Sequence, residues 1–362
     1  MGGVSLEGMT DTENLTLTER LLGQLLAGAE LFSVHLGVQL GLYRVLHEHP
    51  DATDAVLAKE AGIAERYARE WLEQQAAAGY VECTSLARRT FRLPDGAADV
   101  LLDPAHPDSG VGMVTVFAGL AHALPAVTAA YRTGGGVPYA DFGAYTRDGI
   151  AAMNLPGFRH ALAREWLPAL PDVVERLSAV PGARVLDLGC GAGASTLALA
   201  GAFPRATVTG IDLDDASIAG ARHAAAGAGL ADRVTFLRQD AADAAGDYAL
   251  VTIFEALHDM GDPVGVLRTA RGLLAPGGVL LVADEKVGDE FTAPAGEVER
   301  LQYAFSVLHC LPATMAERPV EAAGTALRAP TVARWAAQAG LSCAVLPIEH
   351  DFWRFYRLSV LD

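Results

Sequence analysis

One segment, residues 185–196, constrains the fold of this chain more than any other. It reads VLDLGCGAGAST, an apolar strand that runs into a glycine-rich turn and then into a helix. Glycines let the backbone approach a ligand closely, and the start of a helix offers free N–H groups. The segment therefore predicts a ligand seated on the turn. Gly189, Gly191 and Ala194 also fit the dinucleotide pattern GxGxxA, so the turn alone does not decide which kind of cofactor binds.

The residues after this turn alternate between short apolar runs and helical stretches. The apolar runs lie at 207–212, 234–240, 248–254 and 278–284. Such alternation predicts a parallel sheet with helices on both faces. Residues 342–349 and 352–361 are separated by too few residues for a crossover helix, so we expect them to pair antiparallel. The prediction is a seven-stranded, Rossmann-like α/β sheet whose last pair is antiparallel.

The first hundred residues predict a mainly helical domain. A helical stripe is expected to be buried at Leu31, Val34, Val38, Leu42, Val45 and Leu46. A second helical unit follows and ends at Gly79, with one side expected to hold Tyr67, Trp71, Leu72 and Ala78. Two short strands, 80–82 and 90–93, complete the order of a winged helix.

The segment after the winged helix stays helical in character but is interrupted twice. We expect the helices to break at 133–138 and at 154–156, because glycine and proline gather there. The resulting division is a winged-helix-like dimerisation domain over 1–105, a helical connector over 106–170, and a ligand-binding domain over 171–362.

The charge of the chain argues against nucleic acid as a partner. There are 44 acidic residues against 27 basic ones, a net charge of -17, which repels polyanions. Residues 1–100 hold 15 acids and 8 bases, so the winged helix lacks a positive footprint. We expect it to mediate dimerisation or to cover a substrate, and a DNA reader stays the alternative.

The chain also lacks the sequence signals of a membrane or secreted protein. No apolar run reaches the length of about 18 residues that spans a bilayer, and the amino terminus has no basic start followed by an apolar stretch. The four cysteines are far apart and form no CxxC pair, which predicts reduced thiols. We expect a cytoplasmic protein that binds no membrane.

Three aspartates sharpen the nature of the ligand. Asp187, Asp212 and Asp240 follow or end three successive strands, so a parallel sheet would gather them at its carboxyl edge. Carboxylates suit a ligand with an amino group, ribose hydroxyls and a sulfonium cation, and they repel a pyrophosphate. S-adenosylmethionine (SAM) is such a ligand. The competing interpretation is that Asp212 and Asp240 only cap helices.

A resemblance supports SAM. Residues 185–196 resemble motif I of class I SAM-dependent methyltransferases, and 274–282 resemble the turn and strand that follow in that fold. Segments 166–177, 256–259 and 306–310, together with the winged half, resemble a bacterial group of winged-helix SAM methyltransferases. The resemblance covers nearly the whole chain from about residue 25. It implies methyl transfer to a small organic acceptor, aromatic or keto-acid-like, with S-adenosylhomocysteine (SAH) as product, in a homodimer.

Carried over residue by residue, the resemblance implies a set of cofactor-binding positions. Gly189, Cys190 and Gly191 would contact the methionine part of SAM. Asp212 would bind the ribose hydroxyls, and Asp240 with Ala241 would contact the adenine edge. Phe254 would form the floor of the site. Two further positions belong to the predicted cofactor site. The whole set is Asp187, Gly189, Cys190, Gly191, Asp212, Leu213, Asp240, Ala241 and Phe254. We expect Cys190 to be a small buried residue of the turn rather than a nucleophile.

The fourth parallel strand is followed by candidate catalytic residues. His258 and Asp259 come just beyond it, beside the place where the methyl group of SAM would lie. This phrase resembles the HDW segment of small-molecule O-methyltransferases, which implies that His258 removes a proton from the acceptor. A neutral imidazole is a suitable base near neutral pH.

His309 raises a second possibility. A lone histidine in an apolar helix is usually a satisfied core residue. His258, Asp259 and His309, however, have the spacing of the metal ligands in methyltransferases that act on the carbon next to an α-keto acid. Two histidines and a carboxylate could hold a divalent metal or iron that chelates the keto acid. A nucleotide-dependent oxidoreductase and a ligand-sensing transcriptional regulator are two competing functions, and O-, N- and C-methylation all stay open.

Overall fold

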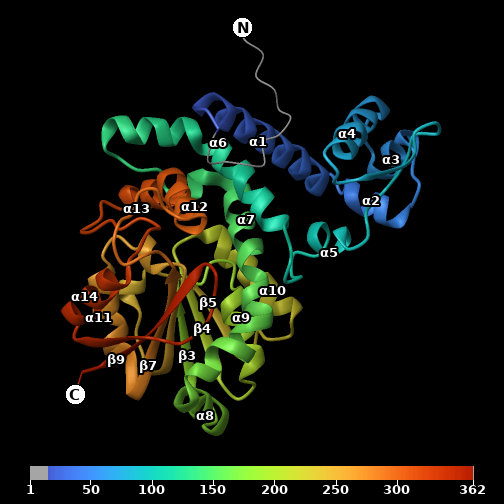
Figure 1. Ribbon diagram of the computed structural model, residues 1–362. Helices are drawn as coiled ribbons and strands as arrows, with labels where there is room; N and C mark the ends of the chain where they lie inside the picture. Colours follow the sequence, from blue (N-terminus) through green and yellow to red (C-terminus); the bar gives the residue numbers. More distant parts are fainter. Residues whose placement is uncertain (1–14, 362) are drawn as a thin grey trace. The chain divides into compact units, whose positions relative to one another are not determined.

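The computed structural model describes residues 15–361 and forms two compact units (Figure 1). The first comprises the residues up to Ala118 together with Asp148–Met153, and the second comprises Gly119–Arg147 and the residues from Asn154 onward. Helices α6 (Val111–Thr133) and α7 (Gly143–Pro156) therefore supply residues to both units. The segment predicted as a connector is thus divided between the two.

The first unit has the element order of a winged helix. Its elements are α1 (Leu17–Gln39), α2 (Leu42–Glu48), α3 (Asp54–Ala61), α4 (Glu65–Ala77), β1 (Glu82–Ser85), β2 (Thr90–Arg92) and α5 (Ala97–Leu101). The two strands pair antiparallel. The rings of Tyr43 and Trp71 meet edge to face, 5.1 Å apart, in the core that α2, α3 and α4 share.

Three local predictions for this unit need correction. The stripe over 31–46 is not one helix, because Gly41 adopts a φ of +66° and separates α1 from α2. Tyr67 is 77% exposed, since the buried face of α4 runs through Ala68, Trp71 and Leu72, one position further on. The first strand begins at Glu82 because the amides of residues 80 and 81 donate to the Gln75 carbonyl at the helix end.

The second unit contains the predicted seven-stranded sheet. Its strands are β3 (Arg184–Leu188), β4 (Thr207–Asp212), β5 (Val234–Arg238), β6 (Tyr248–Phe254), β7 (Leu274–Glu285), β8 (Leu341–Val345) and β9 (Trp353–Val360). The order is β5-β4-β3-β6-β7-β9-β8. β3 to β7 are parallel, and β9 is antiparallel to both β7 and β8. The fold class is confirmed.

Helices cover both faces of this sheet (Figure 1). One face packs against α8 (Pro171–Ala179), α9 (Ala194–Ala202), α10 (Asp215–Gly227) and the π-helix η3 (Gly157–Trp166). The other packs against α11 (Pro263–Leu273) and α14 (Ala329–Gln338). All seven residues of the central strand β6 are buried, so functional groups of this strand must lie at or beyond its end.

The short elements at the carboxyl edge of the sheet carry most of the candidate site. They are the single-turn helices η2 (Tyr139–Phe142), η5 (Ala241–Asp243) and η6 (Leu257–Asp259), then α12 (Glu297–Phe305), the π-helix η7 (Ser306–Cys310) and α13 (Leu311–Ala316). A further single turn, η4 (Leu167–Ala169), leads into α8.

The two predicted helix breaks have different outcomes. α6 ends at Thr133, as predicted. The break at 154–156 is wrong, because the chain continues through Pro156 from α7 into the π-helix η3. Proline removes one donor of the α-helical ladder, and a wider π-turn lets the backbone stay helical beyond it.

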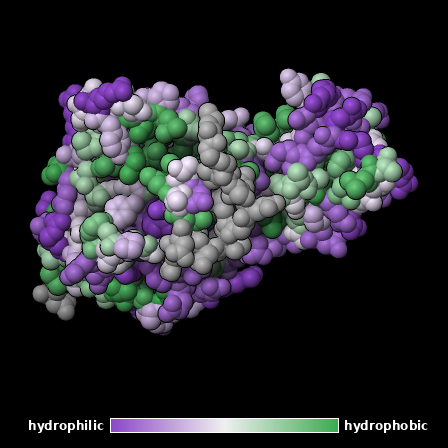
Figure 2. Space-filling view, turned by 45° about the horizontal axis from the view of Figure 1, so that its top comes forward, coloured by the Kyte–Doolittle hydropathy of each residue, from purple (hydrophilic) through white to green (hydrophobic). Residues whose placement is uncertain are grey.

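Within residues 15–361, two helices are long and apolar enough to span a membrane by length and composition alone. These are α1 and α6, whose most apolar stretches are 17% and 44% buried. α1 leaves a row of leucines exposed, among them Leu17, Leu21, Leu25 and Leu36. Figure 2 shows hydrophobic residues among hydrophilic ones on the face that it presents.

Candidate functional site at the carboxyl edge of the sheet

The glycine turn after β3 is bonded to the neighbouring strand β4. The amides of Gly189 and Cys190 both donate to the Ile211 carbonyl, at 2.9 and 3.1 Å. Gly189 and Gly191 have φ of +70° and +50°, which favours glycine. A Cβ on Gly189 would lie 2.8 Å from that of Ala256, whereas one on Gly191 would meet nothing within 4 Å. The turn is therefore packed at its first glycine and open at Gly191.

Asp212 holds the open part of this turn. Its Oδ2 accepts a hydrogen bond from the Gly191 amide at 2.8 Å, and its Oδ1 accepts one from the Asp214 amide at 2.9 Å. Burial raises the pKa of Asp212, while these two amides oppose the rise. The cap of α10 is Asp214, which accepts from the Ser217 amide at 2.8 Å. Asp212 is thus a half-buried carboxylate at the sheet edge and not the helix cap.

Asp240 and Asp187 have other surroundings. Asp240 is exposed and caps η5, because its side chain accepts a hydrogen bond from the Ala242 amide at 2.8 Å. This contact agrees with the competing interpretation of Asp240 as a helix cap. Asp187 is 1% exposed and accepts from three hydroxyls, those of Ser195 (2.6 Å), Thr196 (2.7 Å) and Thr252 (2.7 Å). Its carboxylate therefore ties β3 to β6 and to α9 rather than lying free at the edge.

The remaining predicted cofactor residues divide between the surface and the core. Leu213 is 51% exposed and Ala241 is half-buried, both just after strand ends. Phe254 is buried, with its ring centre 5.5 Å from that of Phe158. Burial, together with the charges of nearby aspartates, raises the pKa of the buried Cys190 thiol well above its usual value. Cys190 therefore stays a neutral thiol.

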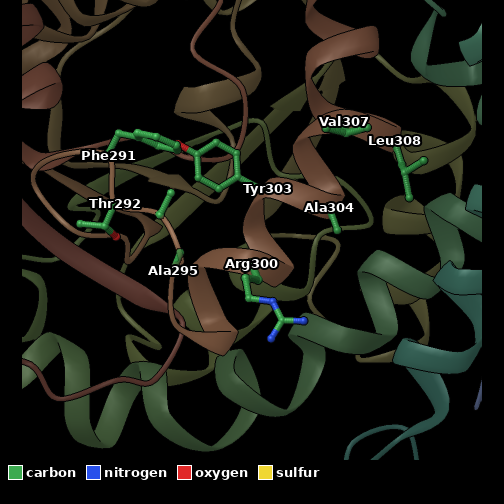
Figure 3. A pocket seen from close by; sticks show the side chains of 9 residues that line it. Phe291, Thr292, Ala295, Arg300, Tyr303, Ala304, Val307 and Leu308 are labelled. Carbon is green, nitrogen blue, oxygen red and sulfur yellow. The ribbon is translucent and has the colours of Figure 1, made fainter. Parts of the chain in front are cut away.

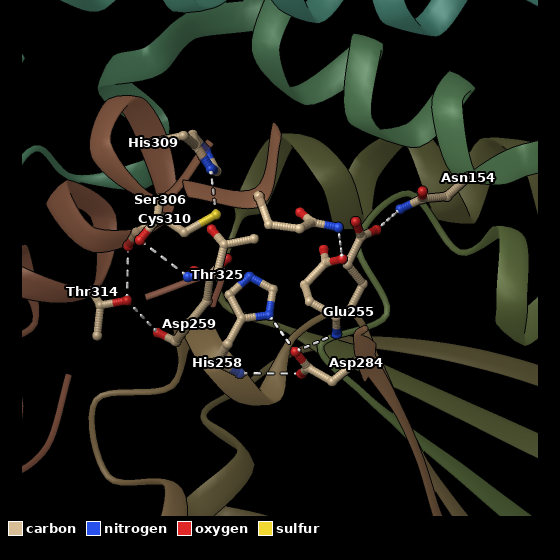
Figure 4. Close-up of polar contacts among 12 residues, drawn as sticks. Asn154, Glu255, His258, Asp259, Asp284, Ser306, His309, Cys310, Thr314 and Thr325 are labelled. Carbon is tan, nitrogen blue, oxygen red and sulfur yellow. Dashed lines mark hydrogen bonds and ion pairs between the residues drawn. The ribbon is translucent and has the colours of Figure 1, made fainter. Parts of the chain in front are cut away.

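His258 lies in η6, immediately beyond β6, and contacts two carboxylates (Figure 4). Its Nδ1 is 2.8 Å from Asp284 Oδ1, and its Nε2 is 3.4 Å from Asp259 Oδ1. Burial alone would lower the pKa of His258, but the charges of Asp259 and Asp284 raise it well above the usual value. The protonated imidazolium is therefore the favoured form in this arrangement, whereas the expected base is neutral.

A pair of glutamates lies beside this histidine, at the ends of β6 and β7. Glu255 and Glu285 are hydrogen-bonded to each other, and burial is the main cause that raises the pKa of both. The Asn154 amide donates to Glu255, and the Gln302 amide donates to the buried Glu285. Two neighbouring buried carboxyls are most stable when they share one proton.

His309 lies near the pair with which it was predicted to bind a metal: burial lowers the pKa of its ring, and the charges of Asp259 and His258 also act on it. His309 is 2% exposed in η7, and its ring packs edge to face against Phe142, 4.5 Å between centres. Its Nδ1 lies 3.5 Å from Cys310 Sγ. The ligand atoms that lie within 4.8 Å of one another belong to His258, Asp259 and Cys310. Cys310, rather than His309, is thus the third member of this cluster.

Sequence reasoning missed Tyr139, Asp284 and the glutamate pair. Tyr139 belongs to the segment predicted as a connector; its ring contacts that of His309, 5.7 Å between centres, and burial followed by the charges of Asp212, Asp214 and Asp259 raises its pKa. Asp284 and Glu285 end the apolar run of β7, so the rule applied to the other strand ends would have found them.

An open cavity of about 490 Å³ lies between the loop after β7 and the helices α12 and η7 (Figure 3). It is lined by Phe291, Thr292, Ala293, Ala295, Arg300, Tyr303, Ala304, Val307 and Leu308. The lining is mainly apolar, with Arg300 as its charged member. None of these residues belongs to the predicted site.

Comparison with known proteins agrees with this fold. Residues 179–324 match the family described as "Methyltransferase domain", and residues 28–102 match the "Rv2258c-like winged HTH domain". A ubiquinone biosynthesis O-methyltransferase of Xanthomonas campestris pv. campestris (strain B100) is 38% identical over 118 residues, which are 32% of this chain and 48% of that protein. The match thus spans about half the length of this curated relative.

Solved structures resemble nearly the whole chain. Human N-acetylserotonin methyltransferase in complex with SAM has a TM-score of 0.71 at 16% identity and covers 97% of this chain and 99% of its own. An O-methyltransferase from neocarzinostatin biosynthesis, in complex with SAH and 1,4-dihydroxy-2-naphthoic acid, has a TM-score of 0.58 at 20% identity and covers 96% and 99%. The chain therefore combines a match to a methyltransferase domain with a match to a winged HTH domain, and its fold over nearly its whole length is similar to that of solved methyltransferases.

Proposed function

We propose that the protein transfers the methyl group of SAM to a small organic acceptor and releases SAH. The observation that carries this proposal is the open glycine turn, whose Gly191 amide is held by the Asp212 carboxylate at 2.8 Å. A carboxylate at this position suits the hydroxyls and the cation of SAM and would repel a diphosphate. The structural relatives that were solved with SAM or SAH support the same donor.

His258 is the residue that we propose to act on the acceptor. Methyl transfer needs a lone pair held in line with the sulfonium, and an acceptor hydroxyl must lose its proton. As a general base, His258 would first have to be neutral and present Nε2 to the acceptor. Asp284, 2.8 Å from Nδ1, would then orient the ring.

The variant His258→Ala tests this role. We expect it to keep SAH affinity while turnover falls by about 10²-fold or more, the usual scale of a general base. Unchanged turnover would remove the histidine from the mechanism. His350→Ala is the matched control, since His350 is a half-buried histidine whose Nδ1 accepts from the Phe352 and Trp353 amides in the turn before β9.

An aromatic or keto-acid-like molecule is the proposed acceptor. The relative solved with 1,4-dihydroxy-2-naphthoic acid supports an aromatic hydroxyl. Incubation with SAM labelled in its methyl group and a panel of phenols, amines and α-keto acids would identify the acceptor class. We expect label in one of these classes. Lack of transfer to every class, combined with lack of SAH binding, would contradict the proposal.

A second candidate is the metal-dependent methylation of an α-keto acid. It is favoured by the cluster of ligand atoms from His258 and Asp259, but the predicted third ligand His309 lies outside that cluster. Metal analysis of the purified protein separates the candidates. Stoichiometric iron, zinc or manganese favours the metal, and its absence, with activity that resists chelators, favours His258 as a base.

The winged-helix unit is proposed to form a homodimer of a cytoplasmic enzyme. Leu21, Leu25 and other apolar residues of α1 are exposed in the single chain. Contact with a second copy of the chain would remove these side chains from water. Light scattering should give a dimer that Leu21→Glu with Leu25→Glu weakens. A DNA-reading regulator is the competing possibility, and retardation of genomic fragments on a gel at low salt would favour it.

A further inference from the structure

We propose that His258, Asp259 and Cys310 form a binding site for a divalent transition-metal ion. Each offers one ligand atom, and these atoms lie within 4.8 Å of one another. An imidazole nitrogen, a carboxylate oxygen and a thiolate sulfur form a donor set suited to Zn²⁺ or Fe²⁺. The inference rests on one part of the proposed function, methyl transfer from SAM, and it replaces the general base His258 with an ion at the acceptor side of the methyl donor.

Two segments that are distant in the sequence contribute to this cluster, and hydrogen bonds hold them together. His258 and Asp259 belong to η6, whereas Cys310 ends η7. The hydroxyl of the buried Thr314 lies between them, 2.8 Å from the Cys310 carbonyl and 3.3 Å from the Asp259 carbonyl. The three ligands are therefore positioned by the fold rather than by chance proximity of flexible side chains.

The histidine ligand already has the outer partner that metal sites use. Asp284 lies 2.8 Å from His258 Nδ1, so the ring is oriented with Nε2 toward Asp259 and Cys310. A carboxylate on the far nitrogen of a ligating histidine fixes the ring and strengthens the ligand. Figure 4 shows this arrangement.

The sulfur of Cys310 has polar neighbours as well. His309 Nδ1 is 3.5 Å from Cys310 Sγ, and the side chain of Thr325 lies beside the thiol. Thr325 is 2% exposed, so its side chain is fixed beside the sulfur, and the buried Oδ1 of Asp259 has the Nε2 of His258 3.4 Å away. The three ligand atoms are therefore held close together among buried neighbours.

This ligand set changes the role of His309. The sequence resemblance implied His309 as the third ligand, but the geometry assigns that place to Cys310 and makes His309 a donor to the sulfur. Three protein ligands leave positions open for the acceptor. An acceptor with two adjacent oxygens, such as an α-keto acid or an ortho-dihydroxy aromatic, could chelate the ion and lose a proton more readily. His258 would then act through the ion and not as a free base.

Cobalt binding tests the site without any need for the acceptor. The full-length protein is stripped with a chelator and titrated with Co²⁺ while its absorption spectrum is recorded. We expect one Co²⁺ per chain, with a sulfur-to-cobalt charge-transfer band that Zn²⁺ removes. Cys310→Ser should lose the band. Cys343→Ser, which changes a half-buried thiol of β8, should keep it.

Two further variants separate ligand from neighbour. His309→Gln should keep the charge-transfer band if His309 only donates to the sulfur. Thr325→Val should keep the band and weaken Co²⁺ binding by about 10-fold to 100-fold, the usual effect of a lost outer partner. Thermal unfolding of each variant confirms that it is folded.

The result that would overturn the inference is a protein that binds SAH but takes up no stoichiometric Co²⁺, or a band that persists in Cys310→Ser. SAH binding is measured by calorimetry on the same samples. Failure of Co²⁺ binding alone removes the metal site and leaves the methyltransferase proposal intact. Failure of SAH binding in the unmodified protein removes the proposed function itself.

Discussion

The two halves of the sheet's carboxyl edge hold their acidic residues in different ways. At the ends of β3, β4 and β5, each aspartate is satisfied by neutral donors, such as the hydroxyls around Asp187 and the amides around Asp212. At the ends of β6 and β7, the acidic residues contact other titratable groups, as Asp284 contacts His258 and Glu255 contacts Glu285.

The difference separates binding from chemistry. Carboxylates held by fixed neutral donors form a rigid site, which suits the binding of a cofactor. Titratable side chains that contact one another change their protonation together, or they can bind a metal ion. Such side chains suit a site that removes a proton from the acceptor. We therefore assign the first half to the methyl donor and the second to the acceptor, and the following predictions test that assignment.

The largest expected effect concerns Asp187. The variant Asp187→Ala leaves three buried hydroxyls without their common acceptor, so we expect the free energy of unfolding to fall by at least about 3 kcal/mol. Urea denaturation measures it. Asp240→Ala, which removes an exposed cap, should cost about 1 kcal/mol or less. Equal losses in the two variants would contradict the structural role of Asp187.

Asp212 should affect the cofactor more than the fold. In Asp212→Ala, the Gly191 amide loses its charged acceptor, and we expect SAH affinity to fall by about 10-fold to 100-fold, the scale of hydrogen bonds to a charged group. Calorimetry measures the affinity. Asp215→Ala is the control, since this neighbour has a side chain that is 77% exposed. The assignment fails if both variants bind SAH equally well.

The glutamate pair should make stability depend on pH. Because the folded-state pKa of Glu285 is raised well above 4.5, the folded protein keeps a proton that the unfolded chain loses, so stability falls as pH rises through this range. Glu285→Gln removes this dependence. We expect it to match the parent at pH 5 and to exceed it by on the order of 1 kcal/mol at pH 8.

The control for this pH effect is Glu175→Gln, a change at an exposed position of α8. Chemical denaturation at several pH values compares the three proteins. If the exposed variant shifts the pH dependence as strongly as Glu285→Gln does, the buried pair is not its source.

The smallest effect is expected at Cys190. Since its thiol is neutral and buried in the turn, Cys190→Ala should cost about 1 kcal/mol of stability and leave turnover within a few-fold. A loss of activity comparable to that of His258→Ala would instead make Cys190 a participant in the reaction.

The sequence predicted the glycine-turn half well because its determinants are local. β4 and β6 begin and end at the predicted residues, since each is an apolar run with clear turn signals on both sides. The turn and Asp212 follow from strand ends that the sequence locates, whereas β5 ends at Arg238, two residues before the predicted end at Asp240. Asp187 shows the limit, because a strand residue gives no sign that three hydroxyls will surround it.

The acceptor side of the edge, at the ends of β6 and β7, was predicted only in part, because segments that are distant in the sequence form it. Thr314 of α13 joins Cys310 to the η6 turn that holds His258, and Asn154 reaches Glu255 across 101 positions of sequence. The π-turn after Pro156 carries α7 on where proline usually predicts a break. Such contacts depend on tertiary packing, which periodicity and composition do not encode.

Calorimetric titration of the unmodified protein with SAH and, separately, with NADH distinguishes the two kinds of ligand that the glycine turn could hold. We expect saturable heat with SAH at one site per chain and none with NADH. Heat with NADH and none with SAH would mean that the turn holds a diphosphate, and the assignment of the first half of the edge to a methyl donor would then be wrong.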